Sequence, residues 1–353
     1  MRFVDLFSGC GGLSQGFVAA GWQPVFGVEI LPAPAKSYAA NFNVPVWSGK
    51  IEDFCAAIDA GTLTLPPVEA VIGGPPCQGH SPLGKMSAKK KRKEHHTDLN
   101  GLWRYFVKVV EAFQPEFILT ENVQEFLKDQ AFKEYEVALK NLGYKLDTGV
   151  LKSEEYGVPQ KRKRAFCVGS RSFDLTLPEP TGERTTVRDA IGNIPFEPDG
   201  KNWHIGRNPK PFSIERYKVI PEGGNRFDLM RERPDITPRC WLEKKTGTTD
   251  VFGRLKWDEP ASTIRTEFFK PEKGRYLHPS AHRPITHREA AALQTFPSDF
   301  VFEGSKTEVA RQIGETVPPK LSKEIALQIS RCSGVLDDRS HAVPKTTLPV
   351  AAE

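Results

Sequence analysis

One cysteine on a rigid turn is the strongest candidate for covalent chemistry in this chain. Cys77 follows two glycines and two prolines, which in turn follow the apolar run at 68–72. Proline fixes the backbone φ angle, so we expect the thiol on a stiff turn at the carboxyl end of a strand, where open α/β sheets place reactive groups. A packed structural cysteine is the alternative, but it would not need such a turn. We therefore predict that Cys77 is a nucleophile.

A glycine-rich turn near the start of the chain predicts a ligand that contains a nucleoside. Gly9, Gly11 and Gly12 lie between a predicted strand and a predicted helix, and Glu29 ends the next predicted strand. Glycines let the backbone approach a ligand at a helix N-terminus, and the carboxylate can bind both ribose hydroxyls. Ser14 replaces the third glycine of the dinucleotide fingerprint, which favours an adenosyl ligand without a pyrophosphate over NAD. A turn without any ligand is the alternative.

Two further segments carry charges at strand ends. Glu121 and Asn122 follow a third apolar strand, where a carboxylate can act as a general acid or base. A helix cap or a surface ion pair is the alternative. The run 160–164 enters another strand, and alternation along it would send Arg162 and Arg164 to one face. A solvated basic edge is the alternative there.

A strand–helix rhythm must position these residues, and it predicts an α/β fold with a mainly parallel sheet. The predicted strands are 2–7, 24–30, 68–73, 116–120, 145–151 and 165–169, and the predicted helices are 12–20, 34–41, 53–59, 99–113 and 130–141. The rhythm stops at about residue 178, and the stretch to 271 is rich in Pro, Gly, Asn, Arg and Lys. This change predicts a second, smaller and irregular domain.

Three more helices are predicted after that stretch, and they divide the chain further. They cover 286–294, 308–313 and 318–329, while the residues beyond 333 lack periodicity. The predicted organisation is a catalytic and cofactor-binding domain at 1–184, the irregular domain at 185–271, a segment at 272–332 that returns to the first domain, and a loose tail at 333–353.

Composition limits the class of protein. The 353 residues are 39% hydrophobic and 26% charged, and no run approaches the roughly 18 apolar residues of a membrane span. The start of the chain has no apolar core of a signal peptide, so we expect a cytoplasmic protein. The six cysteines show no C-x-x-C spacing, so neither a disulfide framework nor a metal site is predicted. The net charge is +5, and six basic residues without an acid lie between Lys85 and Lys93.

Taken together and in this order, the motifs resemble the DNA cytosine-5 methyltransferase family, of the bacterial restriction–modification type. The matching segments are 7–12, 73–81, 121–123, 160–164, 283–290, 293–297 and 312–319, and they span the chain from 3 to about 329. The resemblance implies a Rossmann-like S-adenosylmethionine-dependent domain with helices on both faces of its sheet, plus a smaller target-recognition domain. It implies sequence-specific methyl transfer to C5 of a flipped-out cytosine.

The resemblance also assigns catalytic roles. It implies that the Cys77 thiolate adds to cytosine C6, so that C5 can attack the sulfonium methyl group through a covalent Cys77–C6 intermediate. Glu121 would hold N3 and its proton, and Arg164 would bind O2. Arg162 would orient Glu121 and the region of Cys77, and Asn122 would fix the Glu121 turn. The sequence does not identify the base that removes the C5 proton, and water is one candidate.

The implied cofactor is S-adenosyl-L-methionine, with S-adenosyl-L-homocysteine as product. The matching positions are Phe7, Gly9, Cys10, Gly11 and Gly12 around the methionine and sugar, Glu29 at the ribose, Ile30 and Ile51 against adenine, and Pro76, Leu102 and Val317 closing the pocket. Two positions depart from the family. Lys50 stands where the family has Asp, and Glu315 where it has Asn, which leaves cofactor affinity and choice open.

The implied partner is double-stranded DNA. The basic residues Lys89, Lys90, Lys91, Arg92 and Lys93 are expected to contact phosphates, with a solvated charge run and a nuclear localisation signal as alternatives. Thr263 and Ile264 match an element that the family uses near the flipped nucleotide. We expect a monomer in the cytoplasm, associated with the nucleoid. A separate cognate restriction endonuclease and the recognition sequence are left open.

Three other functions compete with this interpretation. A nicotinamide dehydrogenase explains the glycine turn and Glu29 but not Cys77 or the run 160–164. A DNA reader without activity would not need the nucleophile. A transfer-RNA cytosine-5 methyltransferase is closest, since it would use the same catalytic set. The basic run and the size of the domain between 164 and 288 favour DNA.

Overall fold

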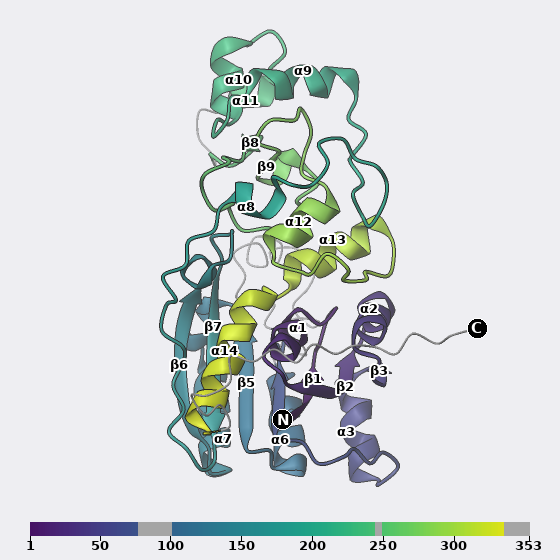
Figure 1. Ribbon diagram of the computed structural model, residues 1–353, viewed down its shortest axis with the longest axis vertical. Helices are drawn as coiled ribbons and strands as arrows, with labels where there is room; N and C mark the ends of the chain where they lie inside the picture. Colours follow the sequence, from purple (N-terminus) through teal and green to yellow (C-terminus); the bar gives the residue numbers. More distant parts are fainter. Residues whose placement is uncertain (77–100, 244–248, 335–353) are drawn as a thin grey trace, which may run out of the picture.

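The computed structural model describes residues 1–76, 101–243 and 249–334, which form two lobes (Figure 1). The sheet lobe contains a seven-stranded sheet, and the small lobe, residues 187–277, contains short helices and a two-stranded sheet. Cys77, the basic run at 89–93 and most of the predicted tail lie outside the described residues. The predicted class, an α/β domain with a smaller irregular partner, is confirmed.

The sheet places the loop that follows Leu6 next to the turn that follows Gly73, at its centre. Its strands are β1 (Arg2–Leu6), β2 (Gln23–Glu29), β3 (Val46–Ser48), β4 (Ala70–Gly73), β5 (Phe117–Asn122), β6 (Lys145–Lys152) and β7 (Lys163–Ser170). The order is β3-β2-β1-β4-β5-β7-β6, parallel from β3 to β5, with β7 antiparallel to both of its neighbours. Strands β2 and β3 are added on one side of β1, and β4 and the later strands on its other side. Open sheets bind ligands at the point where the strand order switches in this way, here between β1 and β4.

Both faces of this sheet are covered because its central strands alternate apolar side chains between two cores. Phe3 and Ile72 pack in one core with α1 (Gly12–Ala19) and α14 (Pro319–Cys332). Val4 and Val71 pack in the other, with side chains of the helices at 51–59, 103–113 and 130–141. These helices are α3 (Ile51–Asp59), α6 (Trp103–Phe113) and α7 (Gln130–Asn141). A parallel sheet with two buried faces has this pattern.

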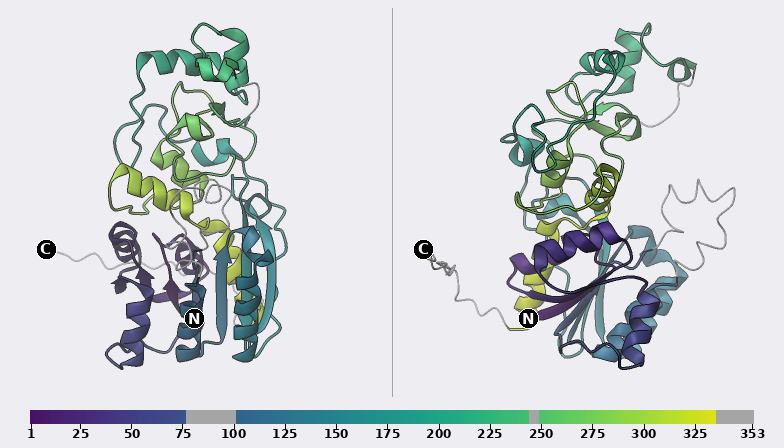
Figure 2. Two further views of the ribbon diagram at one scale, coloured as in Figure 1. Left: turned by 180° about the vertical axis from the view of Figure 1, so that it is seen from behind. Right: turned by 90° about the vertical axis from the view of Figure 1, so that its right-hand side faces the viewer.

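Helix α14 brings the end of the described chain back to its beginning. A Cβ atom on Gly16 of α1 would lie 1.8 Å from Ser322 Oγ of α14, so only glycine permits this close packing. In both views of Figure 2 the yellow α14 lies within the sheet lobe. Helices α12 (His287–Leu293) and α13 (Lys306–Glu315) lie between the lobes (Figure 1), and all three predicted C-terminal helices are confirmed.

One buried arginine and a small apolar cluster hold the short elements of the small lobe together. Its elements are α8 (Val187–Ile191), α9 (Pro211–Val219), α10 (Arg226–Glu232), α11 (Arg239–Glu243), β8 (Gly253–Arg254) and β9 (Arg275–Leu277). Arg254 is 3% exposed and donates hydrogen bonds to the carbonyls of Tyr217, Ile220, His278 and Ala281. Short elements held in this way leave little periodicity in the sequence.

The remaining described elements complete the connections. They are α2 (Pro32–Phe42), which follows β2, and the 3₁₀ helices η2 (Gln124–Lys128), η3 (Ser153–Tyr156) and η4 (Pro271–Lys273). Within the described ranges, no helix has the length and apolar character needed to cross a bilayer.

Candidate active site

The loop after β1 has the backbone conformation that its glycines predict. Phe7, Gly9 and Gly11 have positive φ angles of 57°, 55° and 95°. The Gly9 N–H donates to Glu29 Oε2 at 2.9 Å, and the Leu31 N–H donates to Oε1 at 2.8 Å. Burial raises the pKa of the Glu29 carboxyl, although these two N–H groups oppose that effect. The carboxylate at the end of β2 is thus fixed against the glycine loop.

The surroundings of this loop fit an adenosyl group. A Cβ atom on Gly9 would meet nothing within 4 Å, whereas one on Gly12 would lie 1.8 Å from Thr316 Oγ1. The Ile30 side chain, next to Glu29, is 57% exposed. Open space at the loop, a fixed carboxylate and an exposed apolar side chain are the features that the sugar and base of a nucleoside need.

The other predicted cofactor residues are divided between this loop and the cores. Cys10 is buried, its Sγ lies 3.9 Å from the Gln312 carbonyl oxygen, and burial raises the pKa of its thiol to about 12. Ile51 and Val317 are buried in the two cores of the sheet, so their side chains offer little surface to a ligand. Pro76 and Leu102 are half-buried.

Sequence analysis missed Asp5, a buried carboxyl beneath the glycine loop. Asp5 Oδ2 accepts a hydrogen bond from Ser14 Oγ at 2.6 Å, and Ser14 Oγ lies 2.8 Å from the Tyr38 hydroxyl. Burial raises the pKa of Asp5 to about 8, and the nearby Glu29 acts in the same direction. Its position inside an apolar strand, facing a serine one turn into the next helix, was the signal that could have identified it.

Glu121 forms an ion pair at the carboxyl end of β5. Arg164 Nε lies 2.9 Å from Glu121 Oε1, and the two side chains are 22% and 14% exposed. Burial raises the pKa of the Glu121 carboxyl, although Arg164 and Arg162 oppose that effect. At neutral pH this carboxyl is therefore better able to hold a proton than an exposed glutamate.

The prediction that Arg162 orients Glu121 is wrong for the direct contact. Arg162 is 1% exposed, and its guanidinium donates to the carbonyls of Ile264, Gly314 and Glu315 at 3.0–3.3 Å. The strand register explains the difference. Glu121 pairs with Phe166, so Arg164, two residues along the same face of β7, lies diagonally beside Glu121, whereas Arg162 precedes the first residue of β7.

Asn122 connects Glu121 to the turn that precedes Cys77. Asn122 Nδ2 donates to the Pro75 carbonyl at 2.9 Å, and its Oδ1 accepts from the Val123 N–H at 2.8 Å. A Cβ atom on Gly74 would lie 3.2 Å from Glu121 Oε2. The start of the Gly-Gly-Pro-Pro turn is thus held against the carboxyl. Cys77 itself lies outside the described residues.

The prediction of a DNA contact is wrong for the side chain of Ile264. Ile264 has no exposed surface and packs in the apolar cluster between the lobes. Its N–H donates to Gln160 Oε1 at 2.7 Å, a residue that sequence analysis did not assign to the site. Thr263 is half-buried, and its hydroxyl donates to the Lys161 carbonyl at 2.7 Å.

The two departures from the family pattern have different surroundings. Lys50 is exposed at the residue before α3. Glu315 pairs with Arg311, whose Nε lies 3.0 Å from Oε2, and both side chains are half exposed. Glu315 raises the pKa of Glu29, and Arg311 lowers it. The additional carboxylate is therefore balanced by a cation of the same helix.

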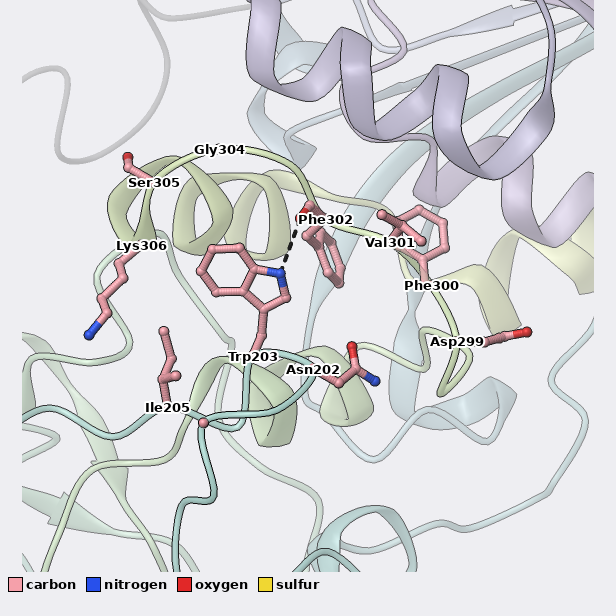
Figure 3. A pocket seen from close by; sticks show the side chains of 11 residues that line it. Asn202, Trp203, Ile205, Asp299, Phe300, Val301, Phe302, Gly304, Ser305 and Lys306 are labelled. Carbon is pink, nitrogen blue, oxygen red and sulfur yellow. Dashed lines mark hydrogen bonds between the residues drawn. The ribbon is translucent and has the colours of Figure 1, made fainter.

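A cavity of about 700 Å³ lies apart from these residues, between the loop 200–205 and the loop 299–306 (Figure 3). Trp203 and Phe302 stand beside each other there, and Trp203 Nε1 donates to the Phe302 carbonyl at 3.1 Å. The lining contains no predicted site residue. Among the residues described, no group of His, Cys, Asp and Glu could hold a metal ion.

Comparisons with known proteins agree on one family. The profile of the C-5 cytosine-specific DNA methylases matches residues 1–331. Type II methyltransferase M1.HphI of Haemophilus parahaemolyticus is 35% identical over 92% of this chain and 86% of its own. Type II methyltransferase M.NgoFVII of Neisseria gonorrhoeae is 33% identical over 93% of this chain and 86% of its own.

Solved structures extend the comparison to the fold. A prophage-encoded DNA modification methyltransferase of E. coli superimposes with a TM-score of 0.73 and 25% identity, over 95% of this chain and 99% of its own. The Dnmt2 methyltransferase of S. pombe has a TM-score of 0.60 at 19% identity, over 94% and 98%. The second likeness concerns the fold alone.

Proposed function

The chain belongs to the C-5 cytosine-specific DNA methylase family, and from this premise we propose which residues carry each step of its reaction. It is a DNA cytosine-5 methyltransferase, and the type II relatives favour DNA over transfer RNA as substrate. The observation that carries the assignment is the Glu121–Arg164 pair, held against the turn before Cys77.

We assign the nucleophilic step to Cys77. Its thiolate forms a bond to cytosine C6, the C5–C6 π pair forms a C4–C5 double bond, and the C4–N3 π pair takes a proton at N3. S-adenosylmethionine, when bound, would supply the methyl group to C5, and N3 would return its proton to Glu121 as the C4–N3 double bond forms again. Loss of the C5 proton to a base restores the C5–C6 double bond and expels the thiolate. Cys55 and Cys167 are buried, with pKa values raised to about 11 and 12, so neither competes as nucleophile.

We assign the N3 proton to Glu121. Burial favours its protonated form, which can donate to N3, and Arg164 stabilises the carboxylate that remains. We also assign the contact to O2 of the base to Arg164, because it pairs with Glu121. Asn122 and Arg162 act through the backbone that they hold.

We assign the cofactor site to the loop from Phe7 to Gly12 with Glu29 and Ile30. S-adenosylmethionine, when bound, supplies an electrophilic methyl group on a sulfonium sulfur. Both Glu29 oxygens accept one backbone N–H each and retain lone pairs for the two ribose hydroxyls. The exposed Ile30 side chain would cover the adenine, and the space at Gly9 would admit the chain between sugar and sulfur.

We place sequence reading in the small lobe and phosphate contacts in the basic run at 89–93. In this proposal residues 1–184 and 272–332 bind the cofactor and the target base, and 185–271 reads the duplex. The protein would act in the cytoplasm as a monomer at the nucleoid. A cognate endonuclease, where one exists, would act separately on the same sequence.

A duplex with 5-fluorocytosine at the target position tests the catalytic assignment. Fluorine cannot leave as a cation, so after methyl transfer the elimination stalls and the protein stays joined to the DNA. We expect a complex that survives denaturing electrophoresis, requires S-adenosylmethionine and maps to Cys77. The Cys77→Ser variant should form none while still binding DNA. An adduct on another cysteine, or equal methylation of transfer RNA by the wild type, would contradict the proposal.

A further inference from the structure

A pair of buried side-chain amides connects three segments between the lobes. Gln160 Oε1 accepts from the Ile264 N–H at 2.7 Å, and Gln160 Nε2 donates to Gln294 Oε1 at 2.8 Å. Gln294 Nε2 donates to the Ile313 carbonyl at 2.6 Å. Neither glutamine has exposed surface. We call Gln160 and Gln294 the amide relay.

One end of the relay meets the segment that carries the catalytic ion pair. The Lys161 N–H donates to the Ala261 carbonyl at 2.8 Å, and Arg162 Nη1 reaches the Ile264 carbonyl at 3.3 Å. The backbone of Ile264 is thus held at its N–H by Gln160 and at its carbonyl by Arg162. Two residues further along the same segment, Arg164 pairs with Glu121. A shift of the small-lobe segment that contains Ala261 and Ile264 would therefore move this segment.

The other end of the relay meets the glycine loop. Ile313 lies in the last turn of α13, and the next carbonyl, that of Gly314, accepts from Arg162 at 3.0 Å. Thr316 follows directly and packs so closely on Gly12 that a Cβ atom there would lie 1.8 Å from its hydroxyl. The relay and Arg162 together therefore link the small lobe, the base site and the cofactor loop.

We propose that Gln160 is a positioning residue. Through Gln294, it couples the binding of DNA by the small lobe to the conformation of the cofactor loop and to the position of the Glu121–Arg164 pair. This inference rests on the proposed function of those two sites. Each link uses one amide as donor and the next as acceptor, so the relay fits one arrangement of the three segments. A fully bonded buried network of this kind specifies a unique packing. Catalytic groups misplaced by about 1 Å can cost on the order of 10²-fold in rate.

The coupling can be measured without turnover, by calorimetric titration with S-adenosylhomocysteine. The titration is run with the protein alone and with a saturating duplex that carries the recognition sequence, mapped beforehand by bisulfite sequencing of a plasmid methylated by the wild type. We expect DNA to change the wild-type affinity by about 5–100-fold, the usual size of such coupling. Gln160→Met and Gln294→Met should each bring this ratio close to one.

A matched control separates positioning from stability. Gln312 is also a buried amide, bonded to Ser37 and Glu303 and outside the relay. Gln312→Met should lower the unfolding temperature by a similar amount yet keep the wild-type ratio. The Gln160→Met/Gln294→Met double variant should lose no more coupling than either single variant, because both break the same link.

The outcomes distinguish this inference from the proposed function. A wild-type ratio near one would overturn the inference, as would relay variants that keep the wild-type ratio or lose no more of it than Gln312→Met. Should Gln160→Met fail to fold, Gln294→Met tests the same link. Failure of the wild type to bind S-adenosylhomocysteine, with or without DNA, would overturn the cofactor site and the relay with it.

Discussion

Glu121 shows how two neighbours set the chemistry of one residue. Its burial favours the neutral acid, while Arg164 at 2.9 Å favours the carboxylate, and burial has the larger effect on its pKa. A group balanced in this way can give up a proton to a ring nitrogen and then be stabilised as an anion. Glu315 and Arg311 form a second balanced pair, next to Glu29.

The pH profile of methyl transfer should report the protonated form of Glu121. Because its pKa is raised and the reaction needs its proton, the wild-type kcat should fall as pH rises through that pKa. Glu121→Gln should lower kcat by about 10²-fold or more and abolish this descending limb. Arg164→Gln should move the limb to higher pH, since it removes the cation that opposes protonation. A limb that stays in place in both variants would assign it to another group.

Glu315 and Arg311 should affect cofactor affinity in opposite directions. Glu315→Asn removes a charge that raises the pKa of Glu29, which favours the ionised carboxylate that accepts ribose hydroxyls. Arg311→Gln removes the opposing cation. We expect tighter S-adenosylmethionine binding in the first variant and weaker binding in the second, each by less than about 10-fold because both side chains are half exposed. Calorimetry with the same sign for both would exclude this electrostatic origin.

At the scale of elements, strand register and helix packing decide which side chains meet. The antiparallel pairing of β5 with β7 sets Arg164 beside Glu121 and leaves Arg162 between the lobes. The close contact of Gly12 with Thr316 sets the segment before α14 against the glycine loop. A one-residue change in either register would separate groups that the reaction needs together.

Alanine substitutions at Gly12 and at Gly9 should impair different properties of the protein, the first its stability and the second its affinity for the cofactor. At Gly12 the new Cβ would lie 1.8 Å from Thr316 Oγ1 and 2.6 Å from the Val317 carbonyl oxygen, so Gly12→Ala should reduce the free energy of unfolding by about 1–3 kcal/mol or more. At Gly9 the methyl group meets no protein atom, and only the positive φ costs about 1–2 kcal/mol. The larger effect of Gly9→Ala should be a loss of affinity for the cofactor. Thermal unfolding and S-adenosylhomocysteine titration of both variants would show whether these losses separate.

At the scale of the whole molecule, the two lobes share one apolar cluster and several buried polar contacts. The cluster unites side chains of α8, α12 and α13 with Cys10 of the glycine loop. Figure 1 shows α12 and α13 between the lobes, where such contacts are made. The two lobes therefore form a continuous body rather than two independent parts.

Electrostatic attraction to DNA should depend on the basic run. Neutralising Lys89, Lys90, Lys91, Arg92 and Lys93 together should weaken binding to all sequences about equally. The plot of log affinity against log salt should flatten by up to about 0.9 for each DNA phosphate that the variant no longer neutralises. Sequence preference should stay the same. An unchanged slope would mean that the run is solvated in the complex, and a changed preference would assign it a role in reading bases.

Sequence analysis predicted most of the sheet lobe because its elements repeat with clear periods. It missed β3, whose three residues are too few for alternation to show. It placed Glu121, Arg164 and Glu29 at strand ends, where the structure has them, since the ends of apolar runs mark these positions. The contacts of Arg162, Ile264 and Gln160 could not be predicted, because these hydrogen bonds join groups that lie 102 to 153 residues apart in the chain.

The packing of α14 on α1 has a consequence for biosynthesis. Ser322 Oγ donates to the Leu13 carbonyl across 309 residues of chain, so one face of the sheet cannot be covered until α14 has left the ribosome. At roughly 5–20 residues per second, this takes about 15–60 s after α1 emerges. During that time the apolar face formed by Phe3, Phe17 and Ile72 is open to chaperones or to other nascent chains. The late arrival of one helix, rather than the chemistry of the site, thus sets the period in which this enzyme is most prone to aggregate.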